Sequence, residues 1–204
     1  MELFREHGYD KTTVAEIAER AGLTRRTFFR YFTDKREVLF FGAEKLEAFL
    51  AASVVAAPSS TPAMEAVAAA LDGVARASDE LPGFADFARQ RHALIRTCTE
   101  LRERELIKLA SLGTAMADAL RRRGIAEPAA RLAAGAGLTV FQVAFDDWVD
   151  GAKSRTLRAH VRDAVDGLKA VASGQAAVKA RQARAKVTPT ARRRPSAAGR
   201  STRR

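Results

Sequence analysis

The sequence predicts an all-α protein: an N-terminal helix-turn-helix domain, a larger helical domain, and a basic C-terminal tail. Apolar residues recur at spacings of three and four along most of the chain, the period of a helix face packed on a core. No segment alternates apolar and polar residues between turn signals, as a strand would. Hydrophobic residues make up 47% of the 204 residues, enough for a folded body.

The net charge of +11 is concentrated at the C-terminus. Ten of the 35 Lys and Arg residues fall in residues 174–204, which contain no Asp or Glu. Residues 1–173 therefore hold 25 basic against 24 acidic side chains and are close to neutral. Because the apolar periodicity also fades after Gly174, we expect residues 174–204 to form a disordered basic tail.

Composition disfavours several classes of protein. The single cysteine, Cys98, excludes an internal disulfide framework and is typical of a reducing cytoplasm. The three histidines and Cys98 lack metal-ligand spacing, and no nucleophile, base and orienting acid form a recognisable set. Neither a signal sequence nor an apolar run of transmembrane length is recognisable. We therefore expect a soluble cytoplasmic protein that is not an enzyme and uses no metal or cofactor.

Residues 13–32 have the pattern of two short helices joined by a tight turn. Thr13, followed three residues later by Glu16, predicts a capping box at the start of the first helix. Gly22 suits the end of that helix, because glycine tolerates the positive φ of a C′ position. Thr24 can cap the second helix. This spacing is typical of a helix-turn-helix motif.

The second helix of the motif begins at Arg25 and is the candidate recognition helix. Phe28 and Phe32, four residues apart, are expected to face the core. The outward side chains are Arg25, Arg26, Thr27, Phe29, Arg30 and Tyr31. Three arginines beside two aromatic rings suit the major groove of DNA, where arginine pairs with guanine and an apolar side chain can touch a thymine methyl.

The remaining helices follow from turn signals and apolar spacing. A short helix is expected before Gly8, and a long one from Lys35 to about Ala57 would connect the motif to the body over roughly 30 Å. Prolines and glycines at 58–62 and 81–83 mark breaks. Further helices are expected at residues 63–78, 84–98, 99–123, 128–150 and 156–173. Small residues near Gly137 would let another helix approach closely.

Residues 3–40 resemble the DNA-binding domain of TetR/AcrR-family repressors. The matching segments are Gly8-Tyr9, Thr12-Thr13-Val14, Ile17-Ala18, Ala21-Gly22-Leu23-Thr24, Phe28-Phe29-Arg30-Tyr31-Phe32 and Lys35. Beyond Phe40 the resemblance is architectural. The recognition helix and the body are similar to actinobacterial members, including mycofactocin-system-type regulators whose relatives bind acyl-CoA. Because family members usually carry a longer first helix, the resemblance implies that this helix is truncated and that Met1 is a downstream or misassigned start.

The resemblance also implies roles for individual residues. Phosphate contacts fall to Thr13, Thr24, Tyr31 and Lys35. Base-edge or groove contacts fall to Arg25, Arg26, Thr27 and Phe29, and Arg30 could make either kind of contact. The predicted domains are a DNA-binding domain at 1–41 and an effector-binding and dimerisation domain at 42–173, followed by the tail.

The implied function is that of a repressor which binds a palindromic double-stranded DNA operator as a homodimer. The helices at 128–150 and 156–173 would form the dimer interface. A small apolar or amphipathic effector, acyl-CoA among the candidates, would bind in the helical body and release the DNA. A non-specific, nucleoid-type DNA-binding protein that acts through the basic tail is the alternative.

Six residues of the body are the candidate ligand pocket: Phe84, Phe87, Arg91, Phe141, Phe145 and Trp148. Their aromatic side chains recur at helical spacing, which fits either ordinary core packing or the lining of an effector cavity. Arg91 lies on the same stripe as Phe84 and Phe87. It is either an anchor for an anionic ligand or an ion-pair partner at the helix surface.

Overall fold

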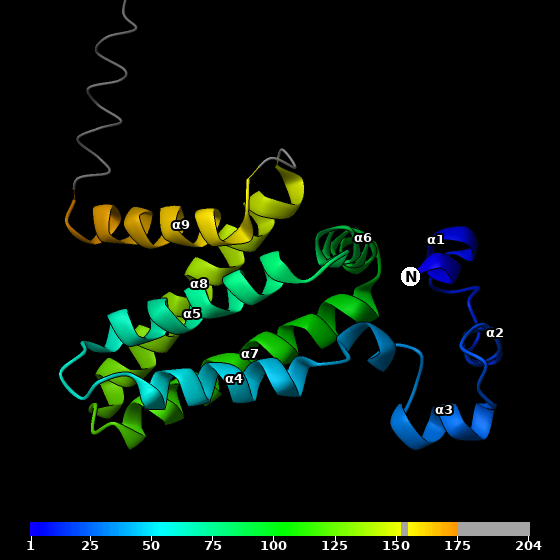
Figure 1. The fold of residues 1–204 in the computed structure, drawn as a ribbon, viewed down its shortest axis with the longest axis horizontal. Coiled ribbons are helices and arrows are strands. Elements are labelled where there is room, and N and C mark those ends of the chain that lie inside the picture. Colours follow the sequence, from blue (N-terminus) through cyan, green and yellow to red (C-terminus); the bar gives the residue numbers. More distant parts are fainter. Residues whose placement is uncertain (152–154, 175–204) are drawn as a thin grey trace, which may run out of the picture. The chain divides into compact units, whose positions relative to one another are not determined.

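The computed structural model describes residues 1–151 and 155–174, which form helices and contain no β-strand (Figure 1). This confirms the predicted all-α fold with an N-terminal helix-turn-helix. Residues Met1–Leu168 form one compact unit, and Lys169–Arg204 are a second unit, described only as far as residue 174. The predicted disorder of the basic tail concerns residues that lie, from 175 on, outside the described part.

Three short helices form the N-terminal domain: α1 (Glu2–His7), α2 (Val14–Arg20) and α3 (Arg25–Tyr31). Helix α1 has only six residues, too few to be stable alone. Its Phe4 is 5% exposed, because it packs in a small core with residues of α6 and α7. Arg20 of α2 also pairs with Glu2, at 2.8 Å. Tertiary packing therefore stabilises this short helix.

The predicted continuous helix from Lys35 to Ala57 is wrong. A 3₁₀ turn, η1 (Glu37–Phe40), is followed by a break, and α4 runs only over Ala43–Ala56. Phe41 has φ −55° and ψ 128°, and Gly42 has φ 89° and ψ 0°, the dihedral angles of a type II turn. Glycine reaches this positive φ without steric cost, so Gly42 ends the short helix and starts the long one. Apolar spacing alone does not reveal such a break.

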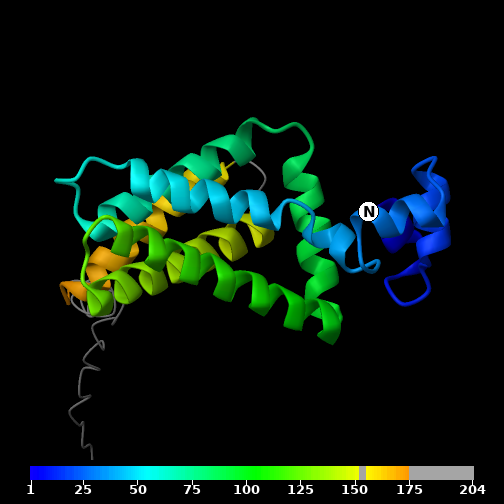
Figure 2. The same ribbon diagram turned by 90° about the horizontal axis from the view of Figure 1, so that it is seen from below.

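The body consists of α4 and five further helices, whose bounds are α5 (Ala63–Glu80), α6 (Phe84–Thr97), α7 (Thr99–Arg122), α8 (Glu127–Asp150) and α9 (Leu157–Ala172). Helix α7 lies beside α4 and α8, and α5 lies beside α4 and α8 (Figures 1 and 2). A single core runs between them, with Leu71, Leu112, Met116 and Leu120 almost fully buried.

Close helix approach in the body depends on a glycine. Gly137 of α8 faces Val67 of α5, and a Cβ added at Gly137 would lie 2.2 Å from Cγ1 of Val67. Real Cβ atoms do not come so close, so with a larger residue either the Val67 side chain or the helices would have to shift. This confirms the expectation that small residues near Gly137 permit close packing of another helix.

Candidate functional site

The helix-turn-helix is held by hydrogen bonds that its sequence predicts. The Thr13 hydroxyl accepts a bond from the Glu16 N–H at 3.2 Å, and the Glu16 carboxylate accepts one from the Thr13 N–H at 2.7 Å. This is the expected capping box. The bond from Thr13 is the main cause that lowers the pKa of Glu16. The start of α2 is therefore held reciprocally by both side chains.

The turn between α2 and α3 is a Schellman motif. Gly22 has φ 67°, and the Leu23 N–H donates to the carbonyl of Ala18 at 2.8 Å. Helix α3 then begins at Thr24, whose hydroxyl accepts a bond from the Thr27 N–H at 3.1 Å. The direction of α3 is therefore set by local backbone bonds, at the positions where the sequence predicts them.

Helix α3 presents its cationic and aromatic side chains to solvent. Phe28 is 2% exposed and anchors the helix, whereas Phe29 is 50% and Tyr31 64% exposed. Arg25 and Arg26 are exposed, and neither has a hydrogen-bond or ion-pair partner among the described residues. The donors of both guanidinium groups are thus available to an outside acceptor.

Arg30 and Tyr31 form a local pair on the same helix. Nη2 of Arg30 donates to the Tyr31 hydroxyl at 2.9 Å, and the guanidinium carbon lies 4.8 Å from the centre of the tyrosine ring. The remaining guanidinium donors stay accessible, so the pair can present a planar cation and a hydroxyl together.

Lys35 has a structural position that the family resemblance does not suggest. Its ammonium group donates to the carbonyls of Tyr9, Asp10 and Thr12 at 2.7, 3.1 and 3.0 Å. An ammonium group has three protons, so all three are used within the protein. A direct phosphate contact would cost Lys35 one of these bonds. In the free protein Lys35 holds the loop between α1 and α2, and its phosphate contact stays a prediction.

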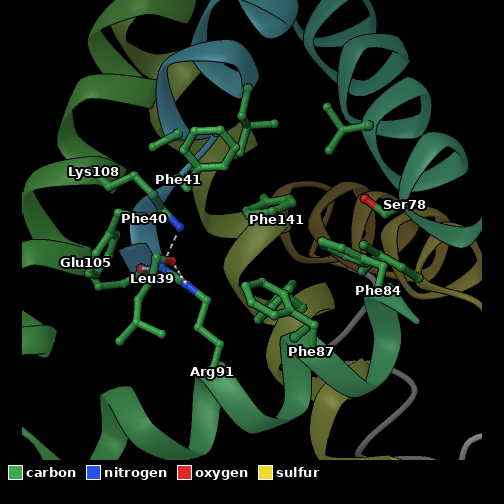
Figure 3. A pocket seen from close by; sticks show the side chains of 17 residues that line it. Leu39, Phe40, Phe41, Ser78, Phe84, Phe87, Arg91, Glu105, Lys108 and Phe141 are labelled. Carbon is green, nitrogen blue, oxygen red and sulfur yellow. Dashed lines mark hydrogen bonds and ion pairs between the residues drawn. The ribbon is translucent and has the colours of Figure 1, made fainter. Parts of the chain in front are cut away.

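A cavity of about 230 Å³ lies in the body, against the segment that precedes α4 (Figure 3). Its walls come from η1 and the type II turn and from α4–α9, and five of the six candidate pocket residues line it: Phe84, Phe87, Arg91, Phe141 and Phe145. Trp148 does not line the cavity. It is 3% exposed and stacks on Phe84 with ring centres 6.2 Å apart, so it supports the wall from behind.

The structure contradicts one of the two alternatives for Arg91, the ion pair at the helix surface, and its role as an anchor for an anionic ligand stays a prediction. Arg91 is 9% exposed, and its Nε donates to the Leu39 carbonyl at 2.6 Å. Its Nη2 lies 2.5 Å from Oε2 of Glu105. Its ion-pair partner is thus inside the protein, beside the cavity, rather than at a helix surface.

Glu105 and Lys108 line the cavity, although sequence reasoning did not single them out. In the charged run at the start of α7 they look like an ordinary surface pair three residues apart, so the sequence contains no signal that distinguishes them. Burial raises the pKa of Glu105, but Lys108 and Arg91 outweigh this effect and hold it below its usual value. Burial and the nearby Arg91 lower the pKa of Lys108, because Glu105 compensates its charge only in part.

Neither a metal-binding cluster nor a membrane-spanning helix is found in the described part of the chain. No group of three His, Cys, Asp or Glu residues within it is placed to hold a metal ion. None of its helices combines the length and the apolar character needed to cross a membrane.

Comparisons with known proteins agree with this geometry. Residues 1–40 match the family model of bacterial regulatory proteins of the tetR family. The HTH-type transcriptional regulator TcmR of Streptomyces glaucescens is 44% identical over 63 residues, which are 30% of this chain and 28% of TcmR. The match to this relative thus spans less than a third of its length.

A solved structure shares the fold of most of the chain. FadR of Thermus thermophilus, a TetR-family transcriptional repressor in complex with lauroyl-CoA, is similar with a TM-score of 0.52 over 82% of this chain and 88% of that chain. The two sequences are 24% identical, so the likeness concerns the fold. The capped helix-turn-helix, the match of residues 1–40 to the tetR family model and the shared helical architecture agree, and together they support a TetR-family regulator.

Proposed function

We propose that this regulator is a homodimeric repressor which binds a palindromic operator and is released by a small apolar or amphipathic effector. The observation that carries the proposal is the exposed face of α3. Arg25 and Arg26 are available there, on a body whose first 173 residues are nearly neutral. Apart from the tail, the electrostatic attraction of the protein to DNA therefore depends on a few side chains of one helix.

The proposed contacts divide into two kinds. Thr13 and Thr24 lie at helix N-termini, where hydroxyls and backbone N–H groups suit phosphate oxygens, and Tyr31 adds a hydroxyl. Side chains proposed to contact base edges or the groove are Arg25, Arg26, Thr27 and Phe29, with Arg30 in either role. The bidentate pairing of arginine with guanine would supply most of the sequence discrimination.

The dimer is proposed to form through α8 and α9. Leu132 and Val143 of α8 are 73% and 48% exposed in the single chain, and they lie on one face of the helix at a spacing of eleven residues. Covering them against a second copy would remove this apolar surface from water. A two-fold axis would then place two copies of α3 in successive major grooves, roughly 34 Å apart.

The proposed effector site is the cavity against η1 and the type II turn. Its aromatic walls suit a hydrocarbon body, and the lauroyl-CoA bound by the Thermus protein supports an amphipathic ligand, acyl-CoA among the candidates. About 230 Å³ is small beside the roughly 300–1,000 Å³ of typical ligand pockets, so a long acyl chain would have to widen the cavity. Phe41 lies at its edge, 74% exposed, with its ring against that of Phe32 at a centroid distance of 5.8 Å.

A competition experiment tests the proposal. An operator is selected from random duplexes, and its affinity is compared with that for unrelated DNA by fluorescence anisotropy at fixed salt. We expect a specificity ratio of about 10³ or more. Arg25→Ala and Arg26→Ala should each weaken operator binding by about 1–3 kcal/mol. Arg76→Ala, which removes an exposed cation from α5, is the matched control and should have little effect.

The rival function is non-specific DNA binding by the basic tail, suggested by its ten cations and absent acidic residues. A specificity ratio near one would favour it. In the repressor, deletion of residues 174–204 should flatten the dependence of binding on salt while operator choice stays the same. The slope of log K against log salt changes by about 0.9 for each phosphate that is no longer neutralised, or by about 9 at most for ten cations.

A further inference from the structure

The segment that leads from the recognition helix to the body forms one wall of the cavity. Leu39, Phe40 and Phe41 line the cavity together with residues of α6, α7 and α8. Glu37, at the start of this segment, is in turn held by Arg104 of α7 through two bonds of 2.8 and 3.0 Å. A molecule in the cavity would therefore touch the link between the two domains.

A compact cluster of largely buried charges faces the cavity beside this wall (Figure 3). Oε2 of Glu105 accepts from Nη2 of Arg91 at 2.5 Å, and Oε1 of Glu105 lies 2.5 Å from Nζ of Lys108. The side chains of Arg91, Glu105 and Lys108 are only 11, 21 and 12% exposed. Two cationic groups thus share one carboxylate at a place where water screens their charges poorly. The remaining positive charge favours the binding of a further anion.

Arg91 connects this cluster to the wall. The Nε that donates to the Leu39 carbonyl belongs to the same planar guanidinium group as the Nη2 bound to Glu105, and this group lies 4.7 Å from the centre of the Phe40 ring. Because the group is rigid, it cannot turn toward a new acceptor in the cavity without disturbing its bond to Leu39.

We propose that the cavity binds a small amphipathic carboxylate, whose head group competes with Glu105 for Lys108 and Arg91 and draws Arg91 away from the Leu39 carbonyl. The hydrocarbon part lies between Phe84, Phe87 and Phe141. Breaking the bond to Leu39 loosens residues 37–42 and with them the position of α3. This inference rests on the ligand-responsive part of the function proposed above, and it adds the charge of the ligand and the residues that sense it.

Two probes with the same chain length test the requirement for charge: octanoate and octan-1-ol. Both are titrated into the full chain by calorimetry, and the emission of the single tryptophan, which stacks on Phe84, is followed in parallel. We expect octanoate to bind at least tenfold more tightly. Lys108→Met should abolish this preference, whereas Arg102→Met, which removes an exposed cation of the same helix, should keep it. If Lys108→Met does not fold, Lys108→Gln replaces it.

Hydrogen exchange tests the coupling without DNA. Octanoate should speed the exchange of amides in residues 37–42 severalfold in the unaltered protein. Equal affinity for the two probes, no binding of octanoate, a preference that survives in the Lys108 variants, or unchanged exchange would each overturn the inference. If the protein shows these octanoate effects but has no operator specificity, the result counts against the repressor function and not against this inference.

Discussion

The ammonium group of Lys35 is hydrogen-bonded to the carbonyl oxygen of Tyr9 at 2.7 Å and lies 4.4 Å from the centre of the Tyr9 ring. The same group bonds two further carbonyls of the loop before α2. One ammonium group thus donates to three backbone carbonyls that would otherwise bond to water, and it fixes this loop of the N-terminal domain. A residue that resembles a phosphate ligand in sequence is, in the folded chain, part of the scaffold.

This arrangement makes the Lys35→Met variant informative. The change leaves three carbonyls without their donor, so we expect a decrease of roughly 2 kcal/mol or more in the free energy of unfolding, measured by urea denaturation. Operator binding should weaken without a change in its salt dependence. A slope smaller by about 0.9 would show that Lys35 contacts a phosphate after all. Lys11→Met, which removes an exposed cation of the same loop, is the control.

Gly42 offers a test of the break before α4. An added Cβ would meet no atom within 4 Å, so any effect of Gly42→Ala comes from the backbone, whose φ is +89°. We expect a decrease of about 1–3 kcal/mol in unfolding free energy. Gly113→Ala lies within α7, where the new Cβ would make an ordinary contact with Leu138, and should instead stabilise by roughly 0.5–1 kcal/mol. Equal effects of the two changes would show that Gly42 does not need its positive φ.

Because of Asp72 in α5, the free energy of unfolding should depend on pH in the acid range. Hydrogen bonds from Arg158 at 2.8–3.0 Å are the main cause that lowers the pKa of Asp72 below 3.8, although burial opposes them. A carboxyl group whose pKa is lower in the folded than in the unfolded chain stabilises the fold at pH values above its unfolded pKa. This stabilisation is lost as the pH falls through the pKa of the folded chain. Asp72→Asn should therefore flatten the fall in stability below about pH 4, measured by urea denaturation. Glu19→Gln, which removes an exposed carboxylate of α2 without an ion-pair partner among the described residues, is the control and should leave this fall unchanged.

The dimer proposal predicts a defined effect of charges on α8. Leu132→Glu and Val143→Glu together should shift the protein from dimer to monomer in sedimentation velocity, because a carboxylate is costly to bury in an apolar interface. Operator affinity should fall because the second recognition helix is no longer held beside the first. Leu81→Glu changes a residue that is 58% exposed outside α8 and α9, and should leave the dimer intact. A dimer that persists in the double variant would place the interface elsewhere.

The sequence by itself determined the features that depend on neighbours along the chain. The Thr13–Glu16 capping box, the glycine at position 22 and the Thr24 cap are local hydrogen-bond patterns, so residue type and spacing are enough to predict them. The same holds for the helical character of the body and for the outward face of α3, because a period of 3.6 residues fixes which side chains share a face.

Only the tertiary structure decided which groups from distant segments meet. The bonds of Lys35 to three carbonyls and the contact of Arg91 with Glu105 join residues of different elements, and nothing in their spacing signals these contacts. Glu105 reads as a surface residue in a charged run and yet lies beside the cavity, because packing against η1 and α6 buries it. Burial and charge pairing arise from the folded arrangement, so they become visible only when the helices are in place.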